Sequence, residues 1–229
     1  MAIVRQIFDS AREWADGVGA NRWKPAGMRV LLSAVHRAAW VRVLTECPNY
    51  RAEPVAAPLD GEGALPLVDL AQGTGETRRT FYRVLGPRGH RPLILVDDLT
   101  YVEGEPIYPL ALAEGALTGR LWWREGDRLR FLPARPHSLA RLQISTLPQS
   151  LAASGNDDQS VPWVEGYEEI LGAELAMLML GKGGAEGDSA REIADLIGPS
   201  WRALLTEVRR ASTGPMSMQA TDDPRDWGG

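Results

Sequence analysis

The sequence has only one cysteine, Cys47, among its 229 residues. A single thiol excludes an internal disulfide framework and a cysteine-based zinc site, so we expect synthesis in a reducing compartment, the cytoplasm. Histidine is also scarce, and His36, His90 and His137 are far apart in the sequence without metal-ligand spacing. We therefore expect neither a metal ion nor a cofactor.

Long hydrophobic runs are also missing. The longest candidate, residues 170–180 (ILGAELAMLML), contains Glu174 and falls short of the roughly 20 residues that span a bilayer. The first residues, MAIVRQIFDSAREWADG, carry charges inside their apolar pattern, unlike a signal peptide. We expect a protein that is not in a membrane and has no visible export signal.

Basic residues are outnumbered. The chain has 25 Lys and Arg against 30 Asp and Glu, and this net charge of −5 argues against a general nucleic-acid binder. The sign of the net charge changes along the chain. Residues 1–52 have more basic than acidic residues, and residues 151–211 have more acidic than basic residues. Two interpretations stay open: solvated helix faces that attract each other within one chain, or complementary surfaces between copies in an assembly.

Recognisable catalytic motifs are lacking. Cys47, just before Pro48, fits a buried inert thiol better than a nucleophile. Residues 180–189 (LGKGGAEGDS) lack the spacing of a phosphate-binding loop. Asp97 and Asp98 are adjacent, so on a strand they would point to opposite faces, and in a loop they would form a turn. No catalytic residue can be assigned, and we expect that the protein is not an enzyme.

Helical spacing marks the first part of the chain. Apolar residues at intervals of three and four predict a short helix over residues 2–15 and a second helix that starts at Pro25 and stops at Pro48. Small residues of the second helix, Ala34, Ala38 and Ala39, would allow another helix to approach closely. Its histidine, His36, is expected to be hydrogen-bonded within the fold or exposed.

Helical spacing returns after residue 160. Residues 166–181 predict a helix ended by glycines, and a capping box at Ser189 and Glu192 predicts the start of the next helix. Gly198-Pro199 is expected to kink or interrupt that helix. The last residues, 212–229, have no periodicity and predict an extended arm.

Short strands are predicted between these helical regions. The runs TFYRVL, PLILVDD, RLWW, RLRFL and ARLQIST are rich in aromatic and branched side chains and are separated by Gly, Pro and Asp. The segment REGD predicts a hairpin with positive φ at Gly126. Trp122 and Trp123 are consecutive, so one must face away from the core, towards a partner within the chain or in another subunit.

The segment order predicts an α+β fold, in which a helical bundle formed by the N- and C-terminal helices carries a β-rich insertion and an extended C-terminal tail. The bundle would be discontinuous, from residues 1–52 and 160–211. Residues 53–159 would form the insertion domain, and residues 212–229 the arm. The helices are expected to pack together, because each of them alone would leave one apolar face exposed to water.

The first helical region has an order of motifs known from one family. A short helix is followed by a glycine-containing loop, by NRW, and by LLSAVHRAAWVRVLTECP, which closes on a proline. This order resembles the head-to-tail connector proteins of tailed bacteriophages, the portal adaptors of the neck. The matching positions are Arg22, Trp23, Leu31, Leu32, Ala38 and Pro48.

The resemblance extends over about residues 2–211. EGEPIYPLA (residues 103–111) is similar to the family's tyrosine-and-proline segment, and LRFLPARPHSLARLQISTLP (residues 129–148) to its strand, proline turn and strand. The sequence departs from the commoner pattern at His36, where a polar amide is expected, and in its acidic closing helices.

This resemblance implies a structural virion protein of the neck, synthesised in the host cytoplasm. Such adaptors look like dodecameric rings that dock on the portal protein, extend the DNA ejection channel and connect to the next neck or tail protein. Double-stranded DNA would pass through without specific binding, and no membrane would take part.

Three groups of residues follow as hypotheses. A portal-docking arm would use Pro215, Met216, Met218 and Trp227. Contacts between subunits or with a partner would use Arg22, Trp23, Trp122 and Trp123. An acidic channel surface, which repels DNA phosphates, would use Glu168, Glu169, Glu174 and Asp195.

A binding module remains the alternative. In this interpretation a small β domain on a helical base binds a peptide or a carbohydrate, with Trp122 or Trp123 as the stacking platform. Such a protein would be a monomer without a ring-forming partner.

Overall fold

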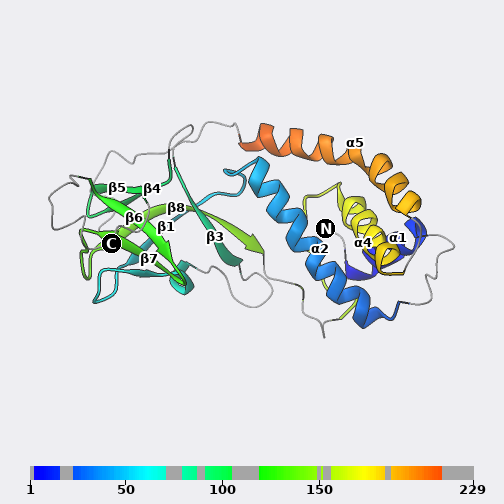
Figure 1. Cartoon of the computed structure of the whole chain (residues 1–229), viewed down its shortest axis with the longest axis horizontal. Coiled ribbons are helices and arrows are strands. Elements are labelled where there is room, and N and C mark those ends of the chain that lie inside the picture. The colour runs from blue at the N-terminus through cyan, green and yellow to red at the C-terminus, as the bar shows by residue number, and fades with distance from the viewer. Residues whose placement is uncertain are drawn as a thin grey trace.

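The computed structural model describes residues 3–15, 23–70, 79–86, 91–104, 119–148, 151, 156–183 and 187–212. Helices gather at one end of the molecule and strands at the other (Figure 1). The α-helices of the described residues are α1 (Val4–Trp14), α2 (Pro25–Glu46), α4 (Glu168–Gly183) and α5 (Gly187–Ser212). Its strands are β1 (Glu53–Pro58), β2 (Leu65–Pro66), β3 (Arg79–Leu85), β4 (Leu93–Val96), β5 (Leu99–Glu103), β6 (Leu121–Glu125), β7 (Arg128–Leu132) and β8 (Leu139–Pro148), with a 3₁₀ helix η2 (Leu67–Leu70).

The strands of the described residues form one eight-stranded mixed sheet centred on β8. Strand β8 pairs antiparallel with β1 along one edge, and with β3 and β4 along the other. The order continues from β4 through β5, β6 and β7 to β2, and β5 and β6 pair in parallel. Helix η2 contacts β1, β2 and β3, so it lies where the two ends of the sheet approach each other and nearly close it into a barrel.

The interior of this sheet has its own hydrophobic core. Tyr101 and Phe131 meet edge to face with ring centroids 5.5 Å apart, and Trp122 is only 3% exposed in the same cluster. The neighbouring Trp123 lies on the other face and is half-buried, as alternation along a strand requires. The predicted turn between β6 and β7 is confirmed, with φ of 59° at Gly126.

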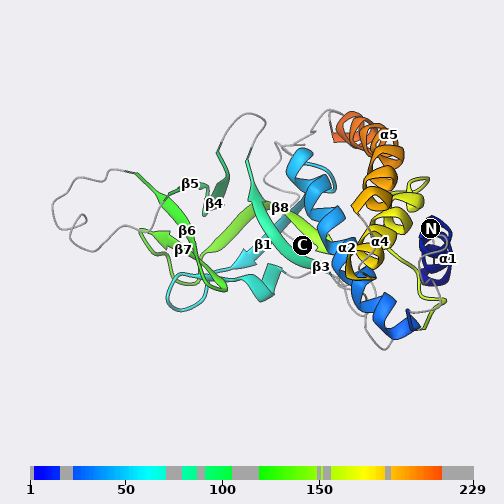
Figure 2. The same cartoon turned by 45° about the vertical axis from the view of Figure 1, so that its right-hand side comes forward.

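The predicted fold class is wrong. A β-rich insertion projecting from a bundle of N- and C-terminal helices would leave the helices as the main body, but the middle of the chain forms a nearly closed sheet with its own core. The β8 strand continues from this sheet to α2 (Figure 2), and Leu147 of β8 is buried among helical residues. The sequence runs predicted several strands, but not their pairing around β8, which joins segments far apart in the chain.

Helix α4 occupies the centre of the helical part. It packs against α1, α2 and α5, and most of its side chains are buried, including Ile170, Leu171 and Leu175. Helix α1 approaches α4 closely at Gly172, where a Cβ atom would lie 2.4 Å from Ser10 Oγ and 2.9 Å from Ser10 Cβ. Glycine at this position therefore permits the spacing between the two helices.

The predicted capping box at α5 is wrong, and of the kink or interruption predicted at Gly198-Pro199 the interruption is wrong. The helix begins at Gly187, so Ser189 lies within it and is not its N-cap, and it continues through Pro199 to Ser212. Proline removes one backbone donor, and at the exposed position of Pro199 the helix accommodates this loss.

Two larger predictions are not resolved by this structure. Apart from Ser212, which ends α5, the predicted arm of residues 212–229 lies outside the described residues. The proposed domain boundaries also remain a prediction.

We expect Gly172→Ala to lower the free energy of unfolding. Rotation of the Ser10 hydroxyl does not relieve the approach to Ser10 Cβ, and overpacking of this kind costs about 1–3 kcal/mol, which exceeds the helix-propensity gain of up to about 1 kcal/mol. Urea denaturation measures the change. The matched control is Gly181→Ala in the same helix, where the new methyl group meets nothing within 4 Å and stability should stay equal or rise. Equal effects at both positions would contradict the close-packing argument.

Candidate functional site

Helix α2 is the element with the most unusual surface. Pro25 stands at its first turn, where a missing N–H group is tolerated, and Cys47 follows its last residue. Its apolar side chains occur on all sides and do not form a single stripe, which is typical of a helix that is covered all round. Three contacts hold it against the rest of the chain, and they determine which face stays free.

The first contact anchors the N-terminal half of α2. Arg29 is only 4% exposed, donates a hydrogen bond from Nη1 to the Asn156 carbonyl at 3.0 Å, and forms an ion pair with Asp157. The same loop accepts a hydrogen bond from the Arg5 backbone N–H at the start of α1, through the Asp157 carbonyl at 2.8 Å. A buried cation needs such partners, so this loop fixes both helices together.

The second contact lies at the middle of α2. His36 is 1% exposed, and its Nε2 lies 2.7 Å from the Pro162 carbonyl oxygen, which also accepts a hydrogen bond from Trp40 Nε1 at 2.9 Å. Trp40 meets Trp163 edge to face at 5.4 Å. Burial lowers the pKa of His36, and the hydrogen bond to Pro162 opposes this only in part. The expectation of a satisfied helical histidine is confirmed.

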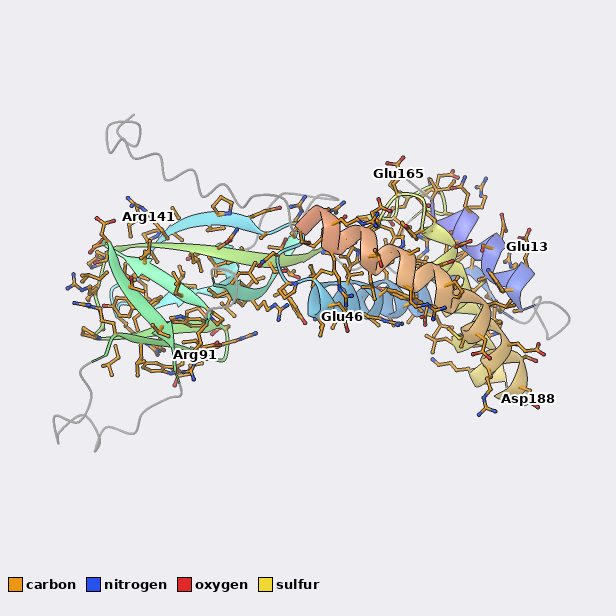
Figure 3. The ribbon with its side chains drawn as sticks, turned by 90° about the horizontal axis from the view of Figure 1, so that it is seen from above. Glu13, Glu46, Arg91, Arg141, Glu165 and Asp188 are labelled. Carbon is orange, nitrogen blue, oxygen red and sulfur yellow. The ribbon has the colours of Figure 1, made fainter. Side chains whose placement is uncertain are left out.

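The third contact lies at the C-terminal end of α2. The Leu44 carbonyl accepts a hydrogen bond from the Arg83 guanidinium of β3, and Glu46 pairs with Arg209 of α5 at 2.7 Å. A cation at this end also complements the helix dipole. Cys47 is 3% exposed, and burial raises the pKa of its thiol, as expected for an inert cysteine. Figure 3 places Glu46 near the junction of helices and sheet.

The remaining face of α2 is apolar and uncovered within the described chain, and we call it the free face. Val30 is 57% exposed, and Arg37 is the only charged residue between Pro25 and Val41 on this side. The other residues of the free face are Ala26, Gly27, Ala34, Ala38 and Thr45. A sustained exposed apolar surface indicates an interaction site more often than scattered single residues do. Sequence periodicity indicated the buried face of α2, but not that the largely apolar opposite face is left uncovered.

The predicted acidic channel residues do not all have free carboxylates. Glu174 accepts a hydrogen bond from Trp201 Nε1 at 2.9 Å, and Glu169 accepts one from Ser200 Oγ at 2.6 Å. Glu168 is half-buried at the start of α4, and Asp195 is exposed on α5. Glu174 therefore has a packing role between α4 and α5, whereas Asp195 faces solvent.

The predicted contact residues have different surroundings. Trp23 is half-buried against the helical core. Trp122 is inside the sheet, with its Nε1 3.4 Å from the Pro92 carbonyl, so its ring is covered by this chain. Trp123 is half-buried and stands opposite Arg130 in β7. Arg22 and the proposed docking residues Pro215, Met216, Met218 and Trp227 lie outside the described residues.

The adjacent carboxylates in the β part have a structural role. Asp97 and Asp98 both have positive φ and form the turn between β4 and β5. Asp97 Oδ1 accepts the Leu139 backbone N–H at 3.2 Å, and Asp98 pairs with Arg141 at 3.3 Å. Hydrogen bonds from the Ser138 side chain and from Leu139 lower the pKa of Asp97. Both carboxylates therefore bind the start of β8.

Neither a metal cluster in the described part of the chain nor a matching family or curated protein indicates a site. Among the described residues, no three His, Cys, Asp or Glu side chains cluster as a metal site would require. The helices of the described ranges are each too short or too polar to cross a bilayer. No protein-family model matches the sequence, and no curated protein matches it. The free face of α2 is thus identified from the geometry alone.

We expect the stability of the protein to fall in mildly acidic solution because of His36. The pKa of His36 in the folded state lies below the unfolded value of about 6.5. Its contribution to the free energy of unfolding is therefore complete above that pH. The contribution is lost as the pH falls below it, by at most about 1.4 kcal/mol per pH unit. Urea denaturation between about pH 7 and about pH 5 measures this dependence. In His36→Gln, the free energy of unfolding should depend less on pH. The control His137→Asn, at an exposed position with positive φ, should keep the pH dependence; an unchanged slope in His36→Gln would exclude His36 as the cause.

Proposed function

We propose that the protein is a structural subunit of a tailed-bacteriophage neck, an adaptor that assembles into a ring on the portal protein, extends the DNA channel and connects to the next neck or tail protein. The observation that carries this proposal is the free face of α2, which is largely apolar and which no part of the described chain covers. Its position within the segment that resembles the connector family supports an assembly role, because a subunit contact would cover the exposed Val30 and its neighbours.

The charge distribution is compatible with such a ring. Acidic residues outnumber basic ones in residues 151–211 and in α4, whereas α5 has equal numbers of both. An acidic lumen would repel DNA phosphates and allow DNA to slide without specific binding. We assign this role to Glu168. We leave out Glu169 and Glu174, whose carboxylates accept hydrogen bonds from Ser200 and Trp201, and Asp195, which shares one row of α5 with Asp188 and Glu192.

A ligand-binding module draws less support from the described surface. Stacking on a sugar ring or a peptide needs an open aromatic face. Trp122 is buried inside the sheet, and Trp123 is half-buried beside Arg130. The uncovered apolar surface lies on α2, away from these tryptophans, which favours the assembly role.

The test of the proposal is the mass of the protein in solution, measured by light scattering with and without the portal ring of the same genome. We expect a stoichiometric complex with the portal. A protein that stays monomeric and separate from the portal at every concentration would refute the adaptor role, and Trp123 would then be tested for small ligands.

We expect deletion of residues 213–229 to abolish portal binding and to leave the fold intact. The deletion begins after Ser212, the last residue of α5, so it removes none of the described core. Co-elution with the portal measures binding, and circular dichroism measures the fold. Trp227→Ala should weaken binding in the same direction, because an aromatic residue in a polar segment is commonly the one that docks. Unchanged binding by the deletion variant would exclude the docking arm.

A further inference from the structure

We propose that the free face of α2 docks on the outer face of α5 of a second copy of this chain, in a head-to-tail contact. This inference deepens the proposed function and rests on its ring geometry. A closed ring needs two different surfaces on each subunit, because the same patch meeting itself gives only a two-fold dimer. The helices offer two such surfaces, since α2 and α5 both turn their buried sides towards α4.

Each surface carries one prominent exposed apolar side chain. Val30 on α2 is 57% exposed, and Leu196 on α5 is 65% exposed. Around Leu196 the outer face of α5 continues with Pro199 and Ala203, both exposed and uncharged. Burying two such side chains against each other removes apolar surface from water, which favours association by about 25 cal/mol per Å² before the costs of binding.

The C-terminal ends of the two helices give both surfaces a common reference point. Glu46 pairs with Arg209, so the C-terminal ends of α2 and α5 lie together, and both helices run towards the sheet (Figure 1). At a rise of about 1.5 Å per residue, Val30 lies about 24 Å before Glu46 along α2, and Leu196 lies about 20 Å before Arg209 along α5. Val30 and Leu196 therefore lie at comparable distances along their helices from this shared end.

Charge complementarity selects a second copy as the occupant. The α2 surface is basic, with Lys24 before its first turn and Arg37 on the free face, whereas the first half of α5 exposes Asp188 and Glu192. By the same rise, Lys24 and Asp188 lie about 33 Å and about 32 Å before the Glu46–Arg209 pair. Opposite charges at comparable distances along the helices from that shared end favour one register of the two surfaces. Figure 3 shows Asp188 at the end of the molecule farthest from the sheet, where a neighbour can reach it.

The test is disulfide cross-linking of the full chain carrying Val30→Cys and Leu196→Cys together, oxidised with diamide alone and with the portal ring. The native Cys47 is 3% exposed, so the unsubstituted protein should not cross-link. We expect a ladder of linked species from the double variant and none from either single variant. The matched control pairs Leu196→Cys with Val68→Cys, which is 67% exposed in η2 beside the sheet, and should give no ladder.

The other results separate the failure of this contact from the failure of the proposed function. A linked dimer from Val30→Cys alone would indicate a two-fold contact of α2 with itself, and equal ladders from the control pair would indicate random collision. Portal binding without any Val30–Leu196 ladder would refute this contact while the proposed function stands. A ladder without portal binding would support the contact and refute the portal role.

Charge reversal gives an independent check. Lys24→Glu places an acidic residue against Asp188 of the next copy and should cause loss of the ladder in the double-cysteine background. Adding Asp188→Lys should restore it, because the pair is then reversed and still complementary. If Lys24→Glu has no effect, or if Asp188→Lys does not restore the ladder, the proposed register is wrong.

Discussion

Burial of the inner face of α2 is the constraint on which the other contacts depend. Met28, Leu32 and Val43 are fully buried against the rest of the helical core, and this packing brings Arg29 to Asp157 and His36 to the Pro162 carbonyl. Buried polar groups of this kind are costly unless each finds its partner. The apolar contact therefore selects the position of α2, and the polar contacts fix its rotation, so that the opposite face of the helix remains in solvent.

Strand β8 connects that helical core to the sheet. It pairs with β1, β3 and β4, and its later residues reach the helical core, where Leu147 is buried. Arg83 of β3 binds the last turn of α2 from the same side. Sheet and helices thus share one strand and one capping arginine. In the proposed ring, a contact made by α2 would be coupled to the sheet through this junction.

The proposed assembly gives the charge gradient of the sequence a physical meaning. Within one chain, opposite charges already meet, as in the pairs of Arg209 with Glu46 and of Arg5 with Asp158. The interpretation of attraction within one chain therefore explains part of the gradient. Lys24, Arg37, Asp188 and Glu192 are exposed, and in the proposed ring a neighbouring copy would supply their partners. The pairs within the chain support the first interpretation, and the second remains part of the proposal.

The sequence by itself determined the local structure wherever the signal lies within a few residues: the helical ranges near α1, α2 and α4, the turn at Gly126, the alternation of Trp122 and Trp123, and the buried thiol of Cys47. Only the tertiary structure decided the fold class, because strand pairing around β8 joins distant segments and leaves no periodic trace in the sequence. It also decided the candidate site. Helix α2 is apolar all round, so which face stays free depends on partners such as Asp157 and Pro162, which lie more than a hundred residues away in the chain.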